Sequence, residues 1–162
     1  MVTGRSMQLT KQVGEYLVSA ELCRLGFIAT TFTGNVPEFD ILAIDGEHKT
    51  KPVQVKTIRG GSWQFDAKKF LDISIRDGVQ TINGKKVLSN PDLICIFVFI
   101  SQGKDKFYVF KLKDLQDIIY KEYTTWLSKH GGRRPKNPDS THVSVSPDDL
   151  TKYQDKWELL KQ

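Results

Sequence analysis

An unbroken apolar stretch over residues 93–100, LICIFVFI, constrains the fold more than any other feature of the chain. Most of its residues are β-branched or aromatic, and it lacks the polar–apolar alternation of a strand with one face in water. The stretch is also far shorter than the ~20 residues that a membrane-spanning helix needs. It therefore predicts a central buried strand in a sheet against which other elements pack.

Three helices are predicted from apolar residues at helical spacing and from capping residues. The first is expected to begin near Ser6 or Thr10 and to end at Leu25, just before Gly26. The second helix is expected to be capped by Asp114 and to end at Gly131-Gly132. The third is expected to begin at Ser146-Pro147.

Further short strands are predicted over residues 27–33, 39–45, 52–58 and 107–112. The loop between the second and third of these is short, so an antiparallel hairpin is expected there. Residues 60–90 leave alternatives open: 66–75 is a short helix or a strand, and 82–85 (Ile-Asn-Gly-Lys) is predicted as a hairpin turn. The order of elements predicts one α/β domain over residues 1–162, a sheet with helices packed against it.

The composition fits a globular protein with one core, at 162 residues, 39% hydrophobic and 27% charged. The N-terminal residues lack the apolar core of a signal peptide, and Cys23 and Cys95 show no CxxC spacing, so a cytoplasmic protein with reduced thiols and no membrane contact is expected. His48, His130 and His142 lack zinc-ligand spacing and are expected at the surface or in loops. The net charge of +5 is compatible with nucleic acid, but a lysine-rich solvated surface has the same composition.

Polar residues gather on one face of the predicted hairpin. Side chains alternate along a strand, so Gln54 and Lys56 share a face, and a register that places Asp40 near Lys56 adds the aspartate to that face. Glu15 lies on a mainly apolar stripe of the first helix, a costly place for a charge without a partner. The alternatives are a helix ion pair of Glu15 with Lys11, a strand-edge aspartate, an ordinary sheet glutamine and an edge lysine.

Phosphodiester hydrolysis gives a chemical reason for this combination of residues. Carboxylates and other oxygen ligands bind Mg²⁺, which polarises a phosphoryl oxygen and lowers the pKa of a bound water. A lysine ammonium can orient the attacking water and offset the charge that builds up in the transition state. A side-chain amide can ligate through its carbonyl oxygen, but it brings no charge.

Asp40, thirteen residues, and then Gln54-Val55-Lys56, preceded by Gly14-Glu15 on a helix, resemble the PD-(D/E)XK nuclease superfamily. Within it, the likeness is to archaeal Holliday junction resolvases and to methylation-dependent restriction endonucleases, some of which carry Q-x-K. The resemblance implies a restriction-endonuclease-like fold, with its core at about residues 8–128 and a C-terminal basic loop and helix at 130–162. It also implies a Mg²⁺-dependent DNA endonuclease in which Mn²⁺ substitutes. The implied roles are metal ligation by Asp40, more weakly by Gln54 and by the Val55 carbonyl, a catalytic Lys56, and a Glu15 that ligates or orients through water.

Two features depart from this pattern. Gln54 stands where an acidic residue is usual, so lower metal affinity or an inactive relative is the alternative. Pro37-Glu38 precedes Asp40 without abutting it, so Glu38 could compete for the ligand role. The rival functions are a catalytically silent nucleic-acid-binding module with the same fold and an interaction protein whose polar face is structural.

Basic residues outside the hairpin are candidates for contacts with the DNA backbone. The predicted set is Arg133, Arg134, Lys136, Lys68 and Lys69, with Lys85 and Lys86 as further candidates. A solvated loop explains the arginines equally well. A homodimer is expected because duplex cleavage needs two sites, and the C-terminal helix with Trp157, Leu159 and Leu160 is either its interface or a cover for the sheet edge.

Overall fold

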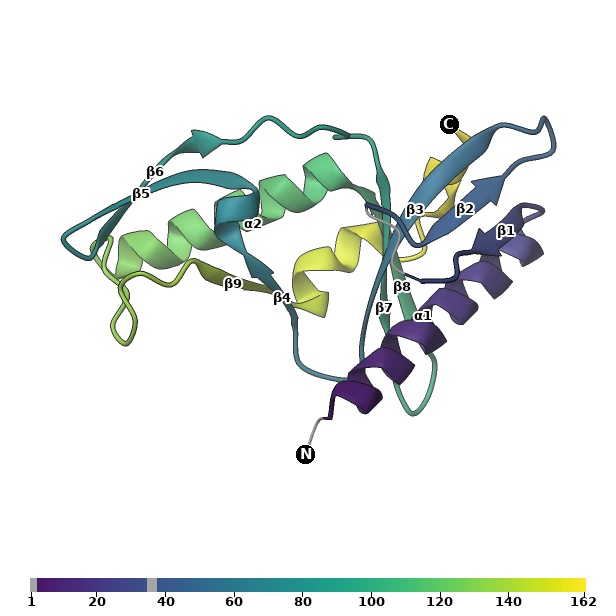
Figure 1. The fold of residues 1–162 in the computed structure, drawn as a ribbon, viewed down its shortest axis with the longest axis horizontal. Helices are drawn as coiled ribbons and strands as arrows, with labels where there is room; N and C mark the ends of the chain where they lie inside the picture. Colours follow the sequence, from purple (N-terminus) through teal and green to yellow (C-terminus); the bar gives the residue numbers. More distant parts are fainter. Residues whose placement is uncertain (1–2, 35–37) are drawn as a thin grey trace.

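The central sheet is built around the apolar stretch described above. In the computed structural model, which describes residues 3–34 and 38–162, the stretch forms β7 (Ile94–Phe99). The sheet has the strand order β1-β2-β3-β7-β8. Its other strands are β1 (Ile28–Thr31), β2 (Ile41–Ile44), β3 (Thr50–Ile58) and β8 (Lys106–Lys111). β3 and β7 run parallel and the remaining pairs run antiparallel, so the sheet is mixed (Figure 1).

β7 buries side chains on both faces of this sheet. The helices that cover the two faces are α1 (Gly4–Arg24) and α2 (Leu112–Lys129). Ile94 and Ile96 join the cluster that packs against α1, whereas Cys95 and Phe97 join the cluster that packs against α2. The predicted buried central strand and the helix-flanked mixed sheet are therefore confirmed. Within the described part of the chain, no helix has both the length and the hydrophobicity to span a membrane.

α1 begins and ends at residues that favour a helix boundary. The Thr3 side chain accepts a hydrogen bond from the Ser6 N–H at 3.1 Å, so the helix starts earlier than the predicted Ser6 or Thr10. Gly26 follows the last turn with a φ of +91°, a conformation that glycine adopts without steric cost. The predicted end of this helix next to Gly26 is confirmed.

α2 also starts earlier than its predicted cap. Asp114 lies inside the first turn, where its carboxylate accepts a hydrogen bond from the Lys111 N–H at 2.9 Å. The aspartate therefore caps the helix from within rather than preceding it. Gly131 and Gly132, both with positive φ, follow the end of the helix as predicted.

The segment that the sequence left open forms mainly strands. Its elements are β4 (Trp63–Asp66), the 3₁₀ helix η1 (Ala67–Lys69), β5 (Leu71–Arg76) and β6 (Val79–Lys85). β5 and β6 are joined at Asp77-Gly78, both with positive φ, the geometry that matches the twist of a hairpin. The predicted turn at residues 82–85 is wrong, because Gly84 lies inside β6, where the pairing register shifts and a bulge forms.

The C-terminal segment contains an unpredicted strand and two 3₁₀ helices in place of one predicted helix. These are β9 (His142–Val145), η2 (Pro147–Tyr153) and η3 (Trp157–Lys161). β9 pairs antiparallel with β4, and both contribute to the core on the α2 side. Ser146 caps η2 as predicted, because its N–H and hydroxyl both bond the Asp149 carboxylate. Leu160 is fully buried in the α1-side core, so this segment covers the sheet within its own chain.

Candidate active site

Asp40 stands where β2 begins, beside a part of β3 that β2 does not pair with. The register sets Ile41 opposite Val53, and the Asp40 N–H continues it by donating to the Val53 carbonyl at 2.9 Å. Oδ2 of Asp40 accepts a hydrogen bond from the Val55 N–H at 2.8 Å. Residues 54–58 of β3 extend past the start of β2, and the backbone holds Asp40 beside them. We call this place, where β2 begins next to residues 54–58 of β3, the β3 step.

Gln54 and Lys56 project from β3 toward α2. Their partners in the parallel pairing with β7 are Cys95 and Phe97, which belong to the core on the α2 side. The register places Asp40 level with Gln54, two residues from the position near Lys56 considered in the sequence analysis. A shift of two residues would leave Asp40 on the face of Gln54. Its carboxylate instead lies in the groove along α1 with Lys11 and Glu15, whereas Gln54 and Lys56 line the cleft on the α2 side, so only these two residues keep the expected grouping.

Glu15 reaches the β3 step because α1 packs very closely on β3. A Cβ added at Gly14 would lie 1.7 Å from Thr57 Oγ1, so only glycine fits at this contact. The neighbouring Glu15 side chain is 18% exposed. The Lys11 ammonium joins the carboxylates from the two elements: its Nζ lies 3.6 Å from Glu15 Oε1 and 3.3 Å from Asp40 Oδ1.

The charges at the step shift one another's pKa values. Burial raises the pKa of Glu15, and the nearby Asp40 carboxylate raises it further, while Lys11 opposes the shift. Burial alone would lower the pKa of Lys11, but the two carboxylates outweigh it and raise that pKa above its ordinary value. The two acids thus repel each other, and the lysine between them relieves the repulsion.

Lys56 is a partly buried lysine on the α2 side of the step. Burial lowers its pKa, and the negative charge of Asp40 only partly offsets this. Its Nζ lies 5.7 Å from the centroid of the Phe65 ring. Burial raises the pKa of the neighbouring Cys95 thiol to about 12, so this thiol is neutral and gives Lys56 no counter-charge. Among the described residues, no carboxylate lies within ion-pair distance of the Lys56 ammonium.

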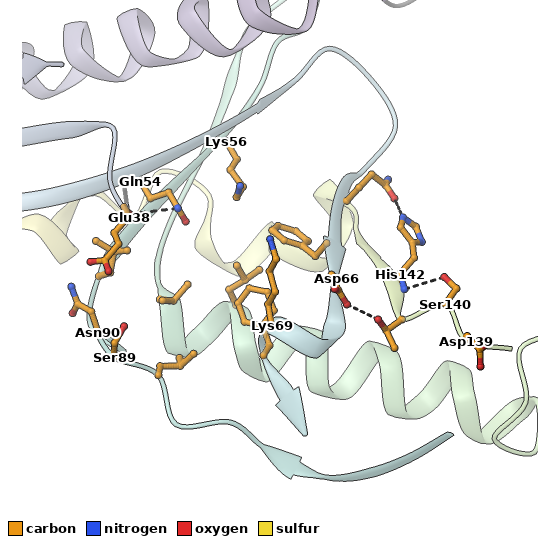
Figure 2. A pocket seen from close by; sticks show the side chains of 18 residues that line it. Glu38, Gln54, Lys56, Asp66, Lys69, Ser89, Asn90, Asp139, Ser140 and His142 are labelled. Atoms are coloured by element: carbon orange, nitrogen blue, oxygen red, sulfur yellow. Dashed lines mark hydrogen bonds between the residues drawn. The ribbon is translucent and has the colours of Figure 1, made fainter. Parts of the chain in front are cut away.

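A cleft of about 790 Å³ opens on this side of the sheet, between β3 and the β4–η1 segment. Figure 2 shows the Lys56 and Lys69 side chains within it, with Gln54 and Glu38 along one wall. Asp66 and His142 line the opposite side of the cleft. The cleft is large enough for a ligand of nucleotide size, and its lining combines the two ammonium groups with the carboxylates of Glu38, Asp66 and Asp139.

Gln54 and Val55 present oxygens at the β3 step. The Gln54 amide nitrogen donates to the Glu38 carbonyl at 3.5 Å, so its amide oxygen is the atom that could ligate a cation. The N–H and C=O of one strand residue point to the same side, so the Val55 carbonyl faces the same edge as the Asp40 carboxylate. Glu38 lines the cleft with a φ of +78°, and Pro37 lies outside the described residues.

These groups fit a hard divalent cation in their chemistry. The donors are oxygens from carboxylates, an amide and a backbone carbonyl, which are the ligands that Mg²⁺ takes in proteins. The Lys11 ammonium already occupies a cation position shared by Glu15 and Asp40. Within the described ranges, no three Asp, Glu, His or Cys side chains form a metal-binding group, so a ligand set here needs the amide and backbone oxygens.

The predicted DNA-contact residues fall in different places. Lys69 lines the cleft, and Lys68 is exposed beside it on η1. Arg134 is held structurally: it donates to the His142 carbonyl at 2.8 Å and lies over the Trp126 ring. Arg133 and Lys136 are exposed in the loop after α2, at the end of the molecule away from α1 (Figure 1). Lys85 forms an ion pair with Asp117, and Lys86 is exposed.

Sequence reasoning missed or undervalued two parts of this site. Lys11 entered only as the partner in an ordinary helix pair with Glu15, yet it also contacts Asp40, whose proximity depends on tertiary packing. His142 is exposed, as expected, but it lies on the half-buried strand β9, where its ring contacts the Gln64 side chain beside the cleft, a position that the sequence did not indicate. The pairing of β4 with β9 joins segments that are distant in the sequence, and no local sequence pattern predicts it.

Comparison with known proteins identifies the fold. No protein family model and no curated protein matches the sequence. The structure resembles that of a bacterial homing endonuclease, I-Ssp6803I, with a TM-score of 0.53 and 14% identity over 96% of this chain and 93% of that chain. A second similar structure is Archaeoglobus fulgidus Hjc, a Holliday junction resolvase from an archaeal hyperthermophile, with a TM-score of 0.44 and 12% identity over 88% of each chain. The likeness to the homing endonuclease confirms the restriction-endonuclease-like fold that the sequence resemblance implied.

Proposed function

We propose that this protein is a metal-dependent DNA endonuclease that hydrolyses phosphodiester bonds. The arrangement at the β3 step is the main support for the proposal. The Asp40 carboxylate accepts a hydrogen bond from the Val55 N–H, and it shares the Lys11 ammonium with the Glu15 carboxylate. Lys56, whose pKa is lowered by burial, lies close enough to Asp40 for the aspartate charge to offset part of that lowering. A fold shared with a homing endonuclease is consistent with action on DNA.

The ligands proposed for Mg²⁺, or Mn²⁺ in its place, are the oxygens of Asp40, Glu15, Gln54 and the Val55 carbonyl. When bound, the ion supplies Lewis-acid polarisation of a phosphoryl oxygen and a water of lowered pKa. Asp40 is the main ligand in this proposal, because the Val55 N–H fixes one oxygen and leaves Oδ1 facing the cation position.

Lys56 acts on the substrate from the cleft side. Its ammonium contacts the attacking water or the scissile phosphate and offsets the negative charge that grows on the phosphate oxygens. Water forms the new P–O bond as the bond to the departing sugar oxygen breaks. Lys69, on the same cleft, holds a neighbouring phosphate.

A nicking assay on supercoiled and branched DNA tests the proposal. Wild-type protein should cut with Mg²⁺ or Mn²⁺ and lose activity with EDTA, while Asp40→Ala and Lys56→Ala should each lower the rate by at least about a hundredfold. Lys129→Ala, at an exposed position near the end of α2, is the control that should keep full activity. Equal cleavage by wild type and both site variants would point to a contaminating nuclease and sink the proposal.

Gln54→Glu is the sharper probe of the ligand set. A carboxylate at this position restores the charge that the amide lacks, so we expect tighter Mn²⁺ binding and equal or faster cleavage. The measurement is calorimetric titration with Mn²⁺ beside the nicking rate. Loss of activity in Gln54→Glu would show that the amide itself is required.

A catalytically silent DNA-binding module is the second candidate, and one observation favours it. The Lys11 ammonium is paired with both carboxylates, and Lys56 adds a second positive charge farther away, so the attraction for a divalent ion is reduced. DNA binding that survives Asp40→Ala and Lys56→Ala, without cleavage by wild type, would support this candidate.

We also propose that the protein acts as a homodimer, because one site cuts one strand of a duplex at a time. Light scattering of the protein with and without duplex DNA measures this directly. A monomer under both conditions would restrict the proposal to nicking.

A further inference from the structure

Lys11 places a cation of the chain's own between the two acids of the proposed metal site. Its Nζ lies 3.3 Å from Asp40 Oδ1 and 3.6 Å from Glu15 Oε1. Both distances exceed the roughly 2.7–2.9 Å of a tight charge-assisted hydrogen bond. The ammonium therefore sits between the carboxylates without being tightly held by either.

The lysine can leave this position without disturbing the core. Its side chain is 55% exposed, whereas those of Glu15 and Asp40 are 18% and 16% exposed. It lies along a groove of about 570 Å³ that α1 lines with polar residues, including Gln8 and Gln12. A flexible lysine stem with a strongly hydrated head can swing into this groove and stay solvated.

We infer that Lys11 is a displaceable counter-ion that holds Glu15 and Asp40 together and competes with a divalent cation for their carboxylates. The inference rests on the metal site of the proposed function. An ammonium and a divalent ion repel each other at such short range, so both cannot stay between the same two carboxylates. Removing the charge of Lys11 should therefore strengthen metal binding, although it should lower the stability of the metal-free protein.

Calorimetric titration with Mn²⁺ alone, in the absence of DNA, tests this competition. Lys11→Met and Lys11→Gln remove the charge, and each should bind Mn²⁺ about tenfold more tightly than wild type. Lys11→Arg keeps the charge and should bind as wild type does. Lys49→Met is the matched control, because it also breaks a Lys–Glu pair, with Glu47, but on an exposed turn.

Thermal unfolding supplies a second readout that needs no activity. Without metal, Lys11→Met should unfold at a lower temperature than wild type, because the two carboxylates lose their shared partner. Saturating Mn²⁺ should raise the unfolding temperature of Lys11→Met by more than it raises that of wild type. Asp40→Asn, placed in both backgrounds, should abolish the tight binding and so locate the ion.

The outcomes separate the inference from the proposed function. Tighter binding in Lys11→Met that Asp40→Asn abolishes supports both. Equal or weaker binding in Lys11→Met, with wild-type binding still lost in Asp40→Asn, overturns the counter-ion role and leaves the metal site standing. Absence of Mn²⁺ binding in every variant overturns the inference together with the metal dependence.

Discussion

At the scale of single residues, Lys56 is the clearest conflict between stability and the proposed chemistry. A lysine that is partly buried, with its pKa lowered by desolvation, destabilises the fold wherever it is charged. An exposed lysine such as Lys68 has no such cost, because water solvates its ammonium. The pairing of β3 does not need a charge at this position, so the presence of the lysine agrees with a role in the cleft.

Lys56→Met should therefore be more stable than wild type at pH 7. The folded pKa lies below the value of about 10.4 for an unfolded lysine, so between these two values the unfolded chain binds more protons. Wild-type stability consequently rises with pH through that window, and the advantage of Lys56→Met shrinks toward pH 10.4. Urea unfolding across this range measures the difference, with Lys68→Met as the exposed control. A difference that stays constant with pH would contradict the lowered pKa.

At the scale of elements, the site depends on how closely α1 lies against β3. Gly14 permits that approach, since any Cβ would collide with the Thr57 side chain. The close contact brings one turn of the helix, with Lys11 and Glu15, to the β3 step. The step itself exists because β3 runs past the start of β2. Because β3 extends past the start of β2, residues on the α1 face of the sheet and residues on the cleft face come close together at the β3 step.

Gly14→Ala tests this contact. Alanine favours a helix over glycine by ~1 kcal/mol, but overpacking costs roughly 1–3 kcal/mol or more, so the variant should be less stable than wild type. Gly4→Ala, on the same helix with open space around it, should be neutral or slightly stabilising. Thr57→Ala should restore part of the stability lost in Gly14→Ala, as a double-mutant cycle by chemical denaturation would show. An undiminished stability in Gly14→Ala would mean that α1 lies farther from β3.

At the scale of the whole molecule, the position of each positive charge matters more than the net charge of +5. Several of the basic residues are already engaged: Arg134 bonds the His142 carbonyl and Lys85 pairs with Asp117 at 2.6 Å. Lys69 faces the cleft beside Lys56. If the proposed function holds, the DNA is therefore expected along the cleft, one side of which is lined by residues 139–142, directly after the basic loop.

The salt dependence of DNA binding distinguishes these lysines. Lys69→Ala should lower the steepness of the log–log plot of affinity against salt by about one unit, because one phosphate contact is lost. Lys85→Ala should leave the slope unchanged, since its ammonium is committed to Asp117 and to the Tyr120 ring. Fluorescence anisotropy at several salt concentrations, with EDTA to prevent cleavage, gives both slopes. The reverse result would place the DNA on the β5–β6 side.

The sequence by itself determined the elements whose signal is local. The apolar run gave β7, the stripe ending at Gly26 gave α1, and the strand period put Gln54 and Lys56 on one face. The predicted turn at residues 82–85 was wrong because the chain turns at Asp77-Gly78, and residues 82–85 continue the pairing of β6 with β5. Local periodicity predicted the direction of Gln54 and Lys56 correctly, because both lie inside β3. It did not predict that Asp40, just before β2, turns its carboxylate toward α1.

Only the tertiary structure decided which of these residues meet. The contact of Gly14 with Thr57, the sharing of Lys11 by Glu15 and Asp40, and the β4–β9 wall of the cleft all join distant segments. Such contacts depend on the packing of whole elements, which backbone propensity and side-chain period do not encode. The sequence therefore supplied the acids, the amide and the lysines, and packing set Lys11 between the carboxylates and turned Lys56 into the cleft.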